Sequence, residues 1–265
     1  MFPDLFHIGP LAVHSYGTLL MLGFLAGIWL ASRQARRLGL PAELGIDLGL
    51  WTLVGAIIFA RGAFAALNWP DFAPDPKRIL FIWREGGLTF HGGLFGGTLA
   101  AVLLARRRRV SFWSLADMAA PALALGYAIA RIGCLLNGCC YGAPTSLPWG
   151  MRFPVFLDAG ITTHPSHPTQ IYSSLGSLVI LAILLKVRAR LPARGQLFCL
   201  YLALYSIMRA AIEVLRRDFT AVRLLDGITQ AQAVSFVILV AAVLGLFLLG
   251  RRQASKTRPA PPASP

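Results

Sequence analysis

Two arginines lie in apolar surroundings, where a permanent charge needs a specific partner. Arg131 follows the apolar run Phe112–Ile129 with no carboxylate beside it, and Arg209 lies inside the apolar run 195–215. A guanidinium in or near hydrocarbon is costly, so it usually faces a protein partner or a ligand rather than lipid. We therefore predict that both arginines contribute to a site. For Arg131 the alternative is a side chain that extends to water at the membrane surface.

Arg209 has two useful neighbours at helical spacing. Tyr205, Arg209 and Glu213 are four residues apart, so they lie along one face of a helix, and Arg209 can pair with Glu213. The structural interpretation is an ion pair that makes both charges tolerable in a membrane. The functional interpretation adds the Tyr205 hydroxyl, one turn away. Arg61, in the apolar run 46–67, is a third candidate with fewer polar neighbours.

His91 lies in the glycine-rich stretch Gly-Leu-Thr-Phe-His-Gly-Gly-Leu, residues 87–94. An imidazole can donate or accept a proton at neutral pH, and this one is expected at the outer end of a helix, within reach of a substrate. A general base and a satisfied structural histidine are equally compatible with the sequence. The glycine pairs 92/96 and 93/97 have the spacing that lets membrane helices approach closely, so we assign them to packing.

Seven apolar segments have the length of a membrane-spanning helix. They cover residues 14–31, 46–67, 88–105, 112–136, 168–187, 195–215 and 230–250. The chain is 56% hydrophobic and only 14% charged, whereas a soluble domain has about a quarter of its residues charged. Only helices and closed barrels satisfy the backbone in lipid, and runs this long indicate helices. We predict an all-α, polytopic integral membrane protein.

The positive charges indicate how the segments are oriented. The formal net charge of +14 is gathered in short runs between apolar segments, which is typical of orientation signals rather than of a nucleic-acid-binding surface. Alternate connections and the C-terminal segment carry Arg33, Arg36, Arg37, Arg106 to Arg109, Lys186, Arg188, Arg190, Arg194, Arg251, Arg252, Lys256 and Arg258. Basic loops stay in the cytoplasm, so we predict the N-terminus outside and the C-terminus in the cytoplasm.

The chain is expected to form a single transmembrane domain at residues 1–250, which carries all the candidate residues. The segment 251–265 is rich in proline and serine, so we expect a disordered cytoplasmic tail. No internal repeat is visible, which disfavours a transporter built from inverted repeats. A transporter or channel, or a non-catalytic lipid-binding membrane protein, would nevertheless explain the apolar segments themselves.

The cysteines suggest either a metal site or a disulfide. Cys139 and Cys140 precede a loop that also holds His164 and His167, but adjacent cysteines do not have the usual spacing of zinc ligands. We therefore expect no metal. A disulfide between Cys134 and one of the adjacent pair is an alternative, because this loop faces an oxidising compartment in the predicted orientation.

Taken together, these motifs resemble those of the bacterial prolipoprotein diacylglyceryl transferase family over nearly the whole chain. The matching pieces, in order, are Tyr16-Gly17, the stretch 87–94 around His91, Arg131-x-Gly-x-x-x-Asn137-Gly-x-x-x-Gly142, His167-Pro-Thr-Gln-Ile-Tyr172 and Tyr205-x-x-x-Arg209-x-x-x-Glu213. Each piece is short, but their combination and order are specific.

The resemblance implies an enzyme of the bacterial inner membrane with its active site toward the periplasm. The reaction would transfer the diacylglyceryl group of phosphatidylglycerol to the lipobox cysteine of a preprolipoprotein signal peptide, forming a thioether and releasing glycerol phosphate. Its site residues would fall on Tyr16, His91, Arg131, Asn137, Gly142, Tyr205, Arg209 and Glu213. We add Arg61 and His167 as candidates for substrate binding. No metal, cofactor or nucleic acid is implied.

The residues suit this reaction. Arg131 and Arg209 can hold a phosphate through paired hydrogen bonds that a lysine cannot reproduce. The acceptor thiol must become a thiolate before it attacks carbon, and His91 is the best-placed general base. Glu213 is expected to hold Arg209 in position rather than to take a proton.

Four positions depart from the family pattern. Ala130 stands where the signature has glycine, Cys134 where it has asparagine, Cys139 where it has glutamate, and Ser173 where a glutamate commonly follows the His-Pro motif. Cys134 comes about one helical turn after Arg131 and should face nearly the same way. It could be an apolar filler, a disulfide partner or a nucleophile. We favour the first two, because the acceptor brings its own thiol.

Overall fold

The computed structural model describes residues 2–9, 11–82, 86–154, 162–191, 193–216, 223–225 and 227–257. A long helix lies at each of the seven predicted segments. These helices are α1 (Ser15–Arg37), α2 (Glu43–Leu67), α5 (Phe90–Arg107), α6 (Phe112–Asn137), α7 (Thr169–Val187), α8 (Gln196–Leu215) and α9 (Gln230–Thr257). The shorter elements are the strands β1 (Asp4–Ile8), β2 (Leu11–His14), β3 (Arg223–Leu225) and β4 (Ile228–Thr229), the helix α3 (Trp69–Phe72) and the 3₁₀ helices η1 (Pro76–Leu80) and η2 (Arg188–Arg190).

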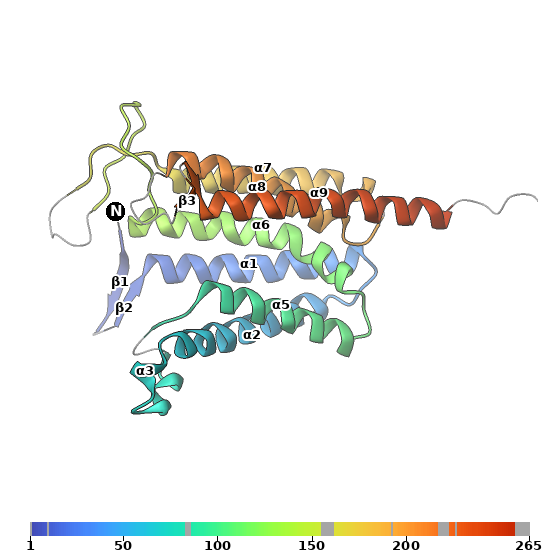
Figure 1. The fold of residues 1–265 in the computed structure, drawn as a ribbon, viewed down its shortest axis with the longest axis horizontal. Coiled ribbons are helices and arrows are strands. Elements are labelled where there is room, and N and C mark those ends of the chain that lie inside the picture. Colours follow the sequence, from blue (N-terminus) through green and yellow to red (C-terminus); the bar gives the residue numbers. More distant parts are fainter. Residues whose placement is uncertain are drawn as a thin grey trace, which may run out of the picture. The chain divides into compact units, whose positions relative to one another are not determined.

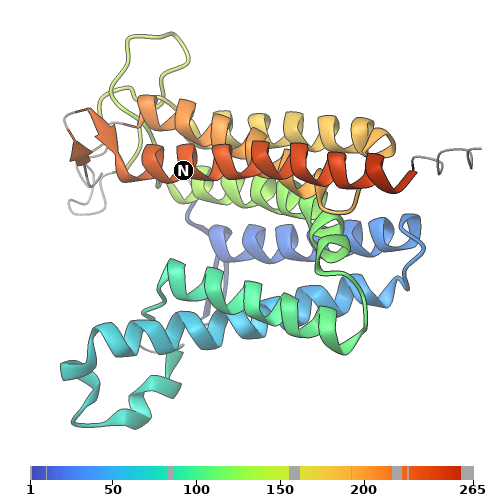
Figure 2. The ribbon, with the colours of Figure 1, turned by 45° about the vertical axis from the view of Figure 1, so that its right-hand side comes forward.

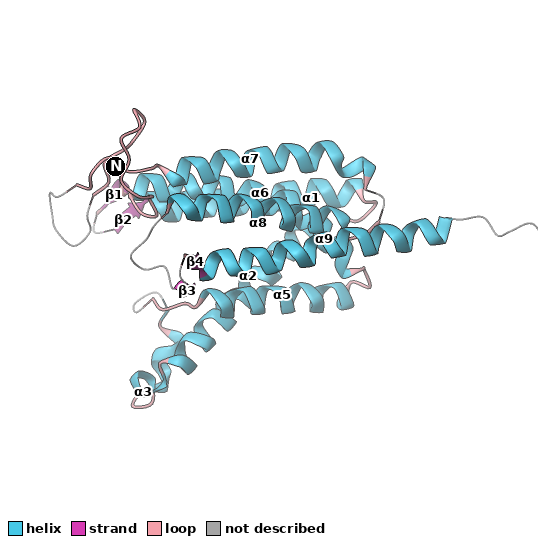
Figure 3. Ribbon diagram, turned by 45° about the horizontal axis from the view of Figure 1, so that its top comes forward, coloured by secondary structure: helices cyan, strands magenta, loops and turns pink. Residues whose placement is uncertain are grey.

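Within the described residues, six helices are long and apolar enough to cross a membrane. The exception among the seven is α5, which forms where the third segment was predicted but is rich in glycine and ends in arginines. Large apolar side chains on the long helices point outward, as Phe236 of α9 does with 67% of its surface exposed. Such a surface suits lipid and would be unfavourable in water. The prediction of an all-α, polytopic membrane protein is confirmed (Figure 3).

Contacts group the chain into two compact units. Unit 1 comprises Met1–Gly27 and Ala119–Pro265, and unit 2 comprises Ile28–Met118, so the chain passes between them within α1 and within α6. At the C-terminal end, α9 continues past Arg251 to Thr257, and the first part of the expected tail is therefore helical. The rest of that tail, from Arg258 on, lies outside the described residues.

In unit 1, helices α6, α7 and α8 share an apolar core, and α9 packs along α8 (Figure 1). The core consists of Ala120 and Ala124 from α6, Ile180 and Leu184 from α7, and Leu197 and Tyr201 from α8. Two serines of α7 tie that helix to α6, since Ser174 donates to the Ala128 carbonyl and Ser177 to the Ala124 carbonyl, each at 2.9 Å. Small residues and interhelical hydrogen bonds hold membrane helices together where water does not compete.

The first part of α1 also belongs to unit 1, where it runs antiparallel to α6 in close contact. A Cβ atom added to Gly23 would lie 2.8 Å from the Gly126 carbonyl oxygen, and one added to Gly27 would lie 3.4 Å from the Ala122 carbonyl oxygen. The backbones approach this closely because glycine lies at the crossing. The start of α1 is thereby placed against the end of α6.

In unit 2, α2 and α5 run antiparallel along one another (Figure 2). The predicted glycine packing is confirmed for one pair. A Cβ atom on Gly96 would lie 2.2 Å from the Gly55 carbonyl oxygen, and one on Gly92 would meet another backbone oxygen at 2.5 Å. Gly97 has more room, with its nearest neighbouring atom at 3.5 Å. The pair 92/96 therefore sets the approach of the two helices.

Candidate active site

Arg131 lies near the end of α6, and its charge meets an aromatic ring. The guanidinium carbon is 4.7 Å from the centre of the Tyr127 ring, and the side chain is only partly exposed. A cation over an aromatic face is stabilised without being neutralised. In the part of the chain that the structure describes, no carboxylate lies within ion-pair distance of Arg131. Its positive charge is therefore available to an anionic ligand.

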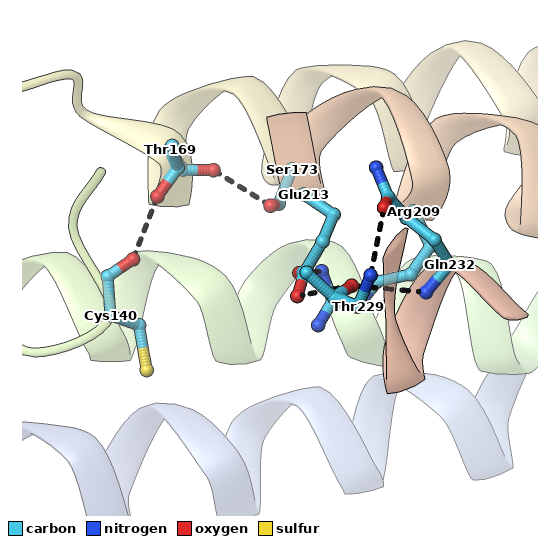
Figure 4. A network of polar contacts seen from close by, with 7 residues as sticks. All are labelled: Cys140, Thr169, Ser173, Arg209, Glu213, Thr229 and Gln232. Atoms are coloured by element: carbon cyan, nitrogen blue, oxygen red, sulfur yellow. Dashed lines mark hydrogen bonds and ion pairs between the residues drawn. The ribbon is translucent and has the colours of Figure 1, made fainter. Parts of the chain in front are cut away.

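Arg209, by contrast, is held by a carboxylate (Figure 4). Its Nη1 donates to Oε2 of Glu213, which confirms the predicted pairing along α8. The other carboxylate oxygen accepts a hydrogen bond from the Thr229 hydroxyl at 3.1 Å. Thr229 and Gln232 then exchange two bonds of 3.1 and 3.3 Å at the start of α9. This network fixes the Glu213 carboxylate, which in turn orients the guanidinium of Arg209.

Two tyrosines connect the surroundings of the two arginines. Tyr127 of α6 and Tyr205 of α8 meet edge to face with ring centres 5.5 Å apart. The charges of Arg209 and Arg131 both act on the Tyr205 hydroxyl. Tyr127 was not predicted, although its signal was present. It precedes Arg131 by four residues, as Tyr205 precedes Arg209, so each arginine has a tyrosine on its own helix face.

Tyr16, near the start of α1, lies beside the same turn of α6. A Cβ atom on Gly133 would be 3.4 Å from Tyr16 Cα, and the charge of Arg131 acts on the Tyr16 hydroxyl. The antiparallel β1–β2 hairpin leads into α1, and the Phe2 amide donates to the Leu136 carbonyl at 3.1 Å. The hairpin thus joins the chain start to the end of α6. The Tyr16 side chain is 40% exposed, so its hydroxyl can meet a ligand.

The loop after α6 packs against the beginning of α7. Asn137 ends the helix, and the chain turns at Gly138, whose φ is 76°. The Gly142 amide donates to the His167 carbonyl at 2.8 Å, and a Cβ atom on Gly142 would lie 2.6 Å from a backbone oxygen. The His167 ring contacts the Tyr172 ring edge-on at 6.1 Å. These contacts show how Gly142 and His167 shape the loop beside the end of α6.

Three thiols gather at this end of α6. The sulfur atoms of Cys134, Cys139 and Cys140 all lie within 4.8 Å of one another. Among the described residues, His164 and His167 are not part of this group, so a mixed cysteine–histidine site does not form. The Cys-x4-Cys-Cys spacing in the sequence could have indicated this cluster. The helix ends at Asn137, between Cys134 and the adjacent pair, and the chain then turns so that the pair lies near Cys134.

The Cys140 thiol, in the loop beyond α6, has a pKa well below its usual value. Hydrogen bonds with the Cys134 and Cys139 thiols are the main cause. The positive charges of Arg216 and Arg131 lower the pKa further, while partial burial opposes the change. The surroundings of Cys140 therefore favour the ionised form of this one thiol.

His91 belongs to unit 2, where it is the second residue of α5. Its side chain is exposed, and its ring meets the Phe90 ring edge-on with centres 5.6 Å apart. An exposed imidazole at a helix start is accessible to a substrate, as a general base must be.

Arg61, also in unit 2, is 3% exposed and has a structural reason for its burial. Its guanidinium donates to backbone carbonyls of the connection between α2 and α5. Nε bonds Ile79 at 2.9 Å, Nη2 bonds Arg78 at 2.7 Å, and Nη1 bonds Gly86 at 2.6 Å and Gly87 at 3.3 Å. This side chain bonds the segment that leads to His91.

Residues 3–248 match the family described as prolipoprotein diacylglyceryl transferase. The chain belongs to that family. The resemblance inferred from the short motifs is thereby confirmed over nearly the whole length.

Individual relatives of this transferase family are similar to the chain from end to end. The phosphatidylglycerol–prolipoprotein diacylglyceryl transferase of Synechococcus elongatus is 41% identical over 252 residues, which cover 92% of this chain and 86% of the relative. The protein of the same name from Nostoc sp. is 37% identical over 271 residues, covering 99% and 93%. The one from Halalkalibacterium halodurans is 38% identical over 241 residues, covering 89% and 82%.

In unit 1, five of the predicted residues are connected to Tyr127 directly or through one another. They are Tyr16, Arg131, Tyr205, Arg209 and Glu213. Two of the departures from the family pattern are buried. Ser173 donates to the Thr169 carbonyl at 2.7 Å (Figure 4). Cys134 is 8% exposed. Cys134 lies close enough to Arg131 to act on its charge, as one helical turn of separation requires.

Proposed function

We propose that this protein transfers the diacylglyceryl group of phosphatidylglycerol to the cysteine thiol of a prolipoprotein. Membership of the transferase family and six helices able to cross a membrane support this function. The observation that carries it is Arg131, a partly buried cation with no carboxylate partner in the described residues, placed beside the Arg209 network. A lipid phosphate is an anion of the right size and charge for that position.

The charges of the site suit the chemical step. The acceptor sulfur bonds to the terminal glycerol carbon of the diacylglyceryl group, and the bond from that carbon to a phosphate oxygen breaks. A thioether forms, glycerol phosphate leaves, and the thiol proton passes to a base. The phosphate gains one negative charge as it leaves. A guanidinium therefore stabilises the transition state more than the bound lipid, which is the condition for catalysis.

In the proposed mechanism the two arginines have different tasks. Arg131 donates to the phosphate with the charge that no carboxylate neutralises. Arg209 is oriented by Glu213 and Thr229, so its remaining donors have a fixed direction. A group that is held before the substrate binds loses less conformational freedom on binding. Glu213 and Thr229 are therefore positioning residues rather than proton carriers.

We propose His91 as the base that accepts the thiol proton. Its support is chemical: among the candidate residues it is the imidazole that is exposed and able to exchange a proton near neutral pH. His91→Gln keeps hydrogen bonding but removes proton exchange. We expect a large loss of turnover that rises again at high pH, where more of the acceptor thiol is ionised.

We also propose that the protein lies in the bacterial inner membrane with its N-terminus outside and the Arg131 end of α6 toward the periplasm. The basic runs at alternate connections support this orientation. A cysteine introduced by Arg107→Cys in a chain whose own cysteines are replaced should not react with an impermeant thiol reagent added to intact cells. A cysteine introduced by Trp149→Cys, in an exposed loop position on the opposite side, should react. The reverse pattern would contradict the orientation.

The function is tested with the purified chain in vesicles that contain phosphatidylglycerol. A signal peptide with a lipobox cysteine should gain the mass of one diacylglyceryl group, and glycerol phosphate should appear in equal amount. Vesicles of phosphatidylcholine and a peptide with serine in place of cysteine are the matched controls. No mass gain with a folded protein, or equal gain by the serine peptide, would exclude the proposed reaction.

A further inference from the structure

The proposed transfer reaction does not use the clustered thiols of Cys134, Cys139 and Cys140, because the acceptor peptide supplies the reacting sulfur. Cys134, Cys139 and Cys140 are all free, and their sulfur atoms lie within 4.8 Å of one another. A tetrahedral site with metal–sulfur bonds of about 2.3 Å places its sulfurs about 3.8 Å apart. Rotation of the cysteine side chains by a small amount would therefore bring the three sulfurs to ligand spacing.

The backbone that carries the thiols is held from several directions. The Cys139 amide donates to the Cys134 carbonyl at 3.1 Å, which links the loop to the end of α6. From α7, the Gln170 side chain donates to the Cys139 carbonyl at 2.7 Å. The Thr169 hydroxyl donates to the Cys140 carbonyl at 2.7 Å (Figure 4). Both donors are 1% exposed. Bonds of this kind, behind the ligands, keep a metal site preorganised.

The backbone conformation of Cys140 is a second observation that supports a functional site at the three cysteines. Its φ is 67°, in the left-handed region that residues other than glycine rarely adopt. Residues held in such conformations cost about 1–3 kcal/mol and cluster at functional sites. Here the strained residue is one of the three that present sulfur to the same point.

The donor set indicates which ion would bind. Three sulfurs, with no imidazole or carboxylate among them in the described residues, favour a soft, thiophilic ion over calcium or magnesium. Three thiolates around a divalent ion leave one net negative charge. The charges of Arg216 and Arg131 both act on Cys140 and would compensate it.

We propose that Cys134, Cys139 and Cys140 form a binding site for a thiophilic d¹⁰ ion, zinc(II) or copper(I), at the outer end of α6. Binding displaces any proton that the three sulfurs still carry, and these protons are released to solvent. Three-coordinate copper(I) would be satisfied by the cysteines alone, whereas zinc(II) would take a water as its fourth ligand. The site adjoins Arg131, and its test does not depend on lipid or peptide.

The test is a titration of the full chain in detergent, reduced and then freed of reductant and metal. Cadmium(II) is the probe, because sulfur-to-cadmium charge transfer absorbs in the ultraviolet and reports thiolate ligands directly. We expect one cadmium per chain, displaced by zinc(II) or copper(I), and the ion that competes better identifies the preferred one. Cys134→Ser and Cys140→Ser should each weaken binding by at least about tenfold, since even outer partners of a metal site contribute that much.

Cys199 supplies the matched control, because it is the remaining cysteine and lies elsewhere. It is buried in α8, where its sulfur would be 2.8 Å from a Cβ atom on Gly245 of α9. Cys199→Ser should bind cadmium as the parent does. Zinc(II) should also raise the unfolding temperature of the parent and of Cys199→Ser, but not of Cys140→Ser, which keeps the test valid if one variant is less stable.

Three results would overturn the proposal. The first is unchanged cadmium binding by folded Cys134→Ser and Cys140→Ser. The second is a parent chain that binds no thiophilic ion although thiol titration finds all four cysteines reduced. If the isolated chain instead contains a disulfide that joins two of the three cysteines and binds no ion after reduction, the cluster is a disulfide site and the metal proposal is wrong. None of these results bears on lipid transfer, which is measured separately.

Discussion

An arginine of an apolar helix has different surroundings in each of the two units of the molecule. In unit 2, Arg61 is almost completely buried, and its guanidinium donates to the backbone carbonyls of four residues between positions 78 and 87. In unit 1, Arg131 lies over the Tyr127 ring and has no carboxylate partner among the described residues. Arg209 is intermediate, because it pairs with Glu213 yet remains partly exposed.

The difference shows that a charge in an apolar segment does not by itself identify a site. A guanidinium has five donors, and its role depends on what those donors meet. Arg61 uses several of them to bond backbone carbonyls of the connection between α2 and α5. Arg131 lies over the Tyr127 ring, and we propose that its charge binds the phosphate of the lipid. Single substitutions of Arg131 and Arg61 can test these two roles separately.

The largest effect should come from Arg131. Arg131→Lys keeps the charge but loses the planar pair of donors, and loss of such a contact in a dry site is worth about 2–4 kcal/mol, roughly 30- to 1,000-fold in rate. We expect that fall in the rate of peptide lipidation and an unfolding temperature close to that of the parent. A lysine variant with near-normal turnover would show that only the charge at long range matters.

Arg61 should show the reverse pattern. Arg61→Met preserves much of the side-chain volume but leaves several buried carbonyls without a donor, which should lower the free energy of unfolding by about 3 kcal/mol. The measurement is thermal unfolding in detergent. Activity per folded molecule should fall much less than in Arg131→Lys at a temperature where both are folded. If Arg61→Met is stable and inactive, Arg61 contacts substrate after all.

The glycines of unit 2 provide a test of its tight packing. Gly96→Ala would place a methyl group 2.2 Å from the Gly55 carbonyl oxygen, so the helices must move apart. Overpacking of this kind costs about 1–3 kcal/mol. Gly97→Ala, one residue along the same helix, meets its nearest atom only at 3.5 Å and is the control. Equal unfolding temperatures for the two variants would mean that α2 and α5 are less closely packed than the structure shows.

The smallest effect should come from the Thr229 hydroxyl. Thr229→Val removes the 3.1 Å hydrogen bond to Glu213 and keeps the shape, so about 0.5–1.5 kcal/mol is expected, a few-fold change in rate. Because Thr229 acts through Arg209, the change should fall on turnover rather than on general stability. Thr229→Ser should restore it. A loss that serine does not restore would indicate packing of the threonine methyl group instead.

Much of the fold and part of the site could be predicted from the sequence. The seven helices, the Arg209–Glu213 pair and the close packing at Gly96 follow from spacing along one helix or from the length of an apolar run. These are local properties, since residues four apart share a face wherever the helix lies. The membrane class follows in the same way, because lipid leaves few alternatives for the backbone.

What only the tertiary structure decided is the partner of each polar side chain. Arg61 bonds carbonyls about twenty residues further along the chain, Glu213 meets Thr229 of β4, and Gln170 bonds Cys139, which precedes it in the chain. Such contacts depend on how loops return to the helices, and no periodicity in the sequence encodes that path. The sequence by itself determined which residues could do chemistry and on which helix faces they lie. The tertiary structure decided that Arg61 bonds loop carbonyls, that Arg131 lies over Tyr127, and that three thiols meet at the end of the same helix. The physical reason is that groups from separate segments become neighbours only when the chain is folded.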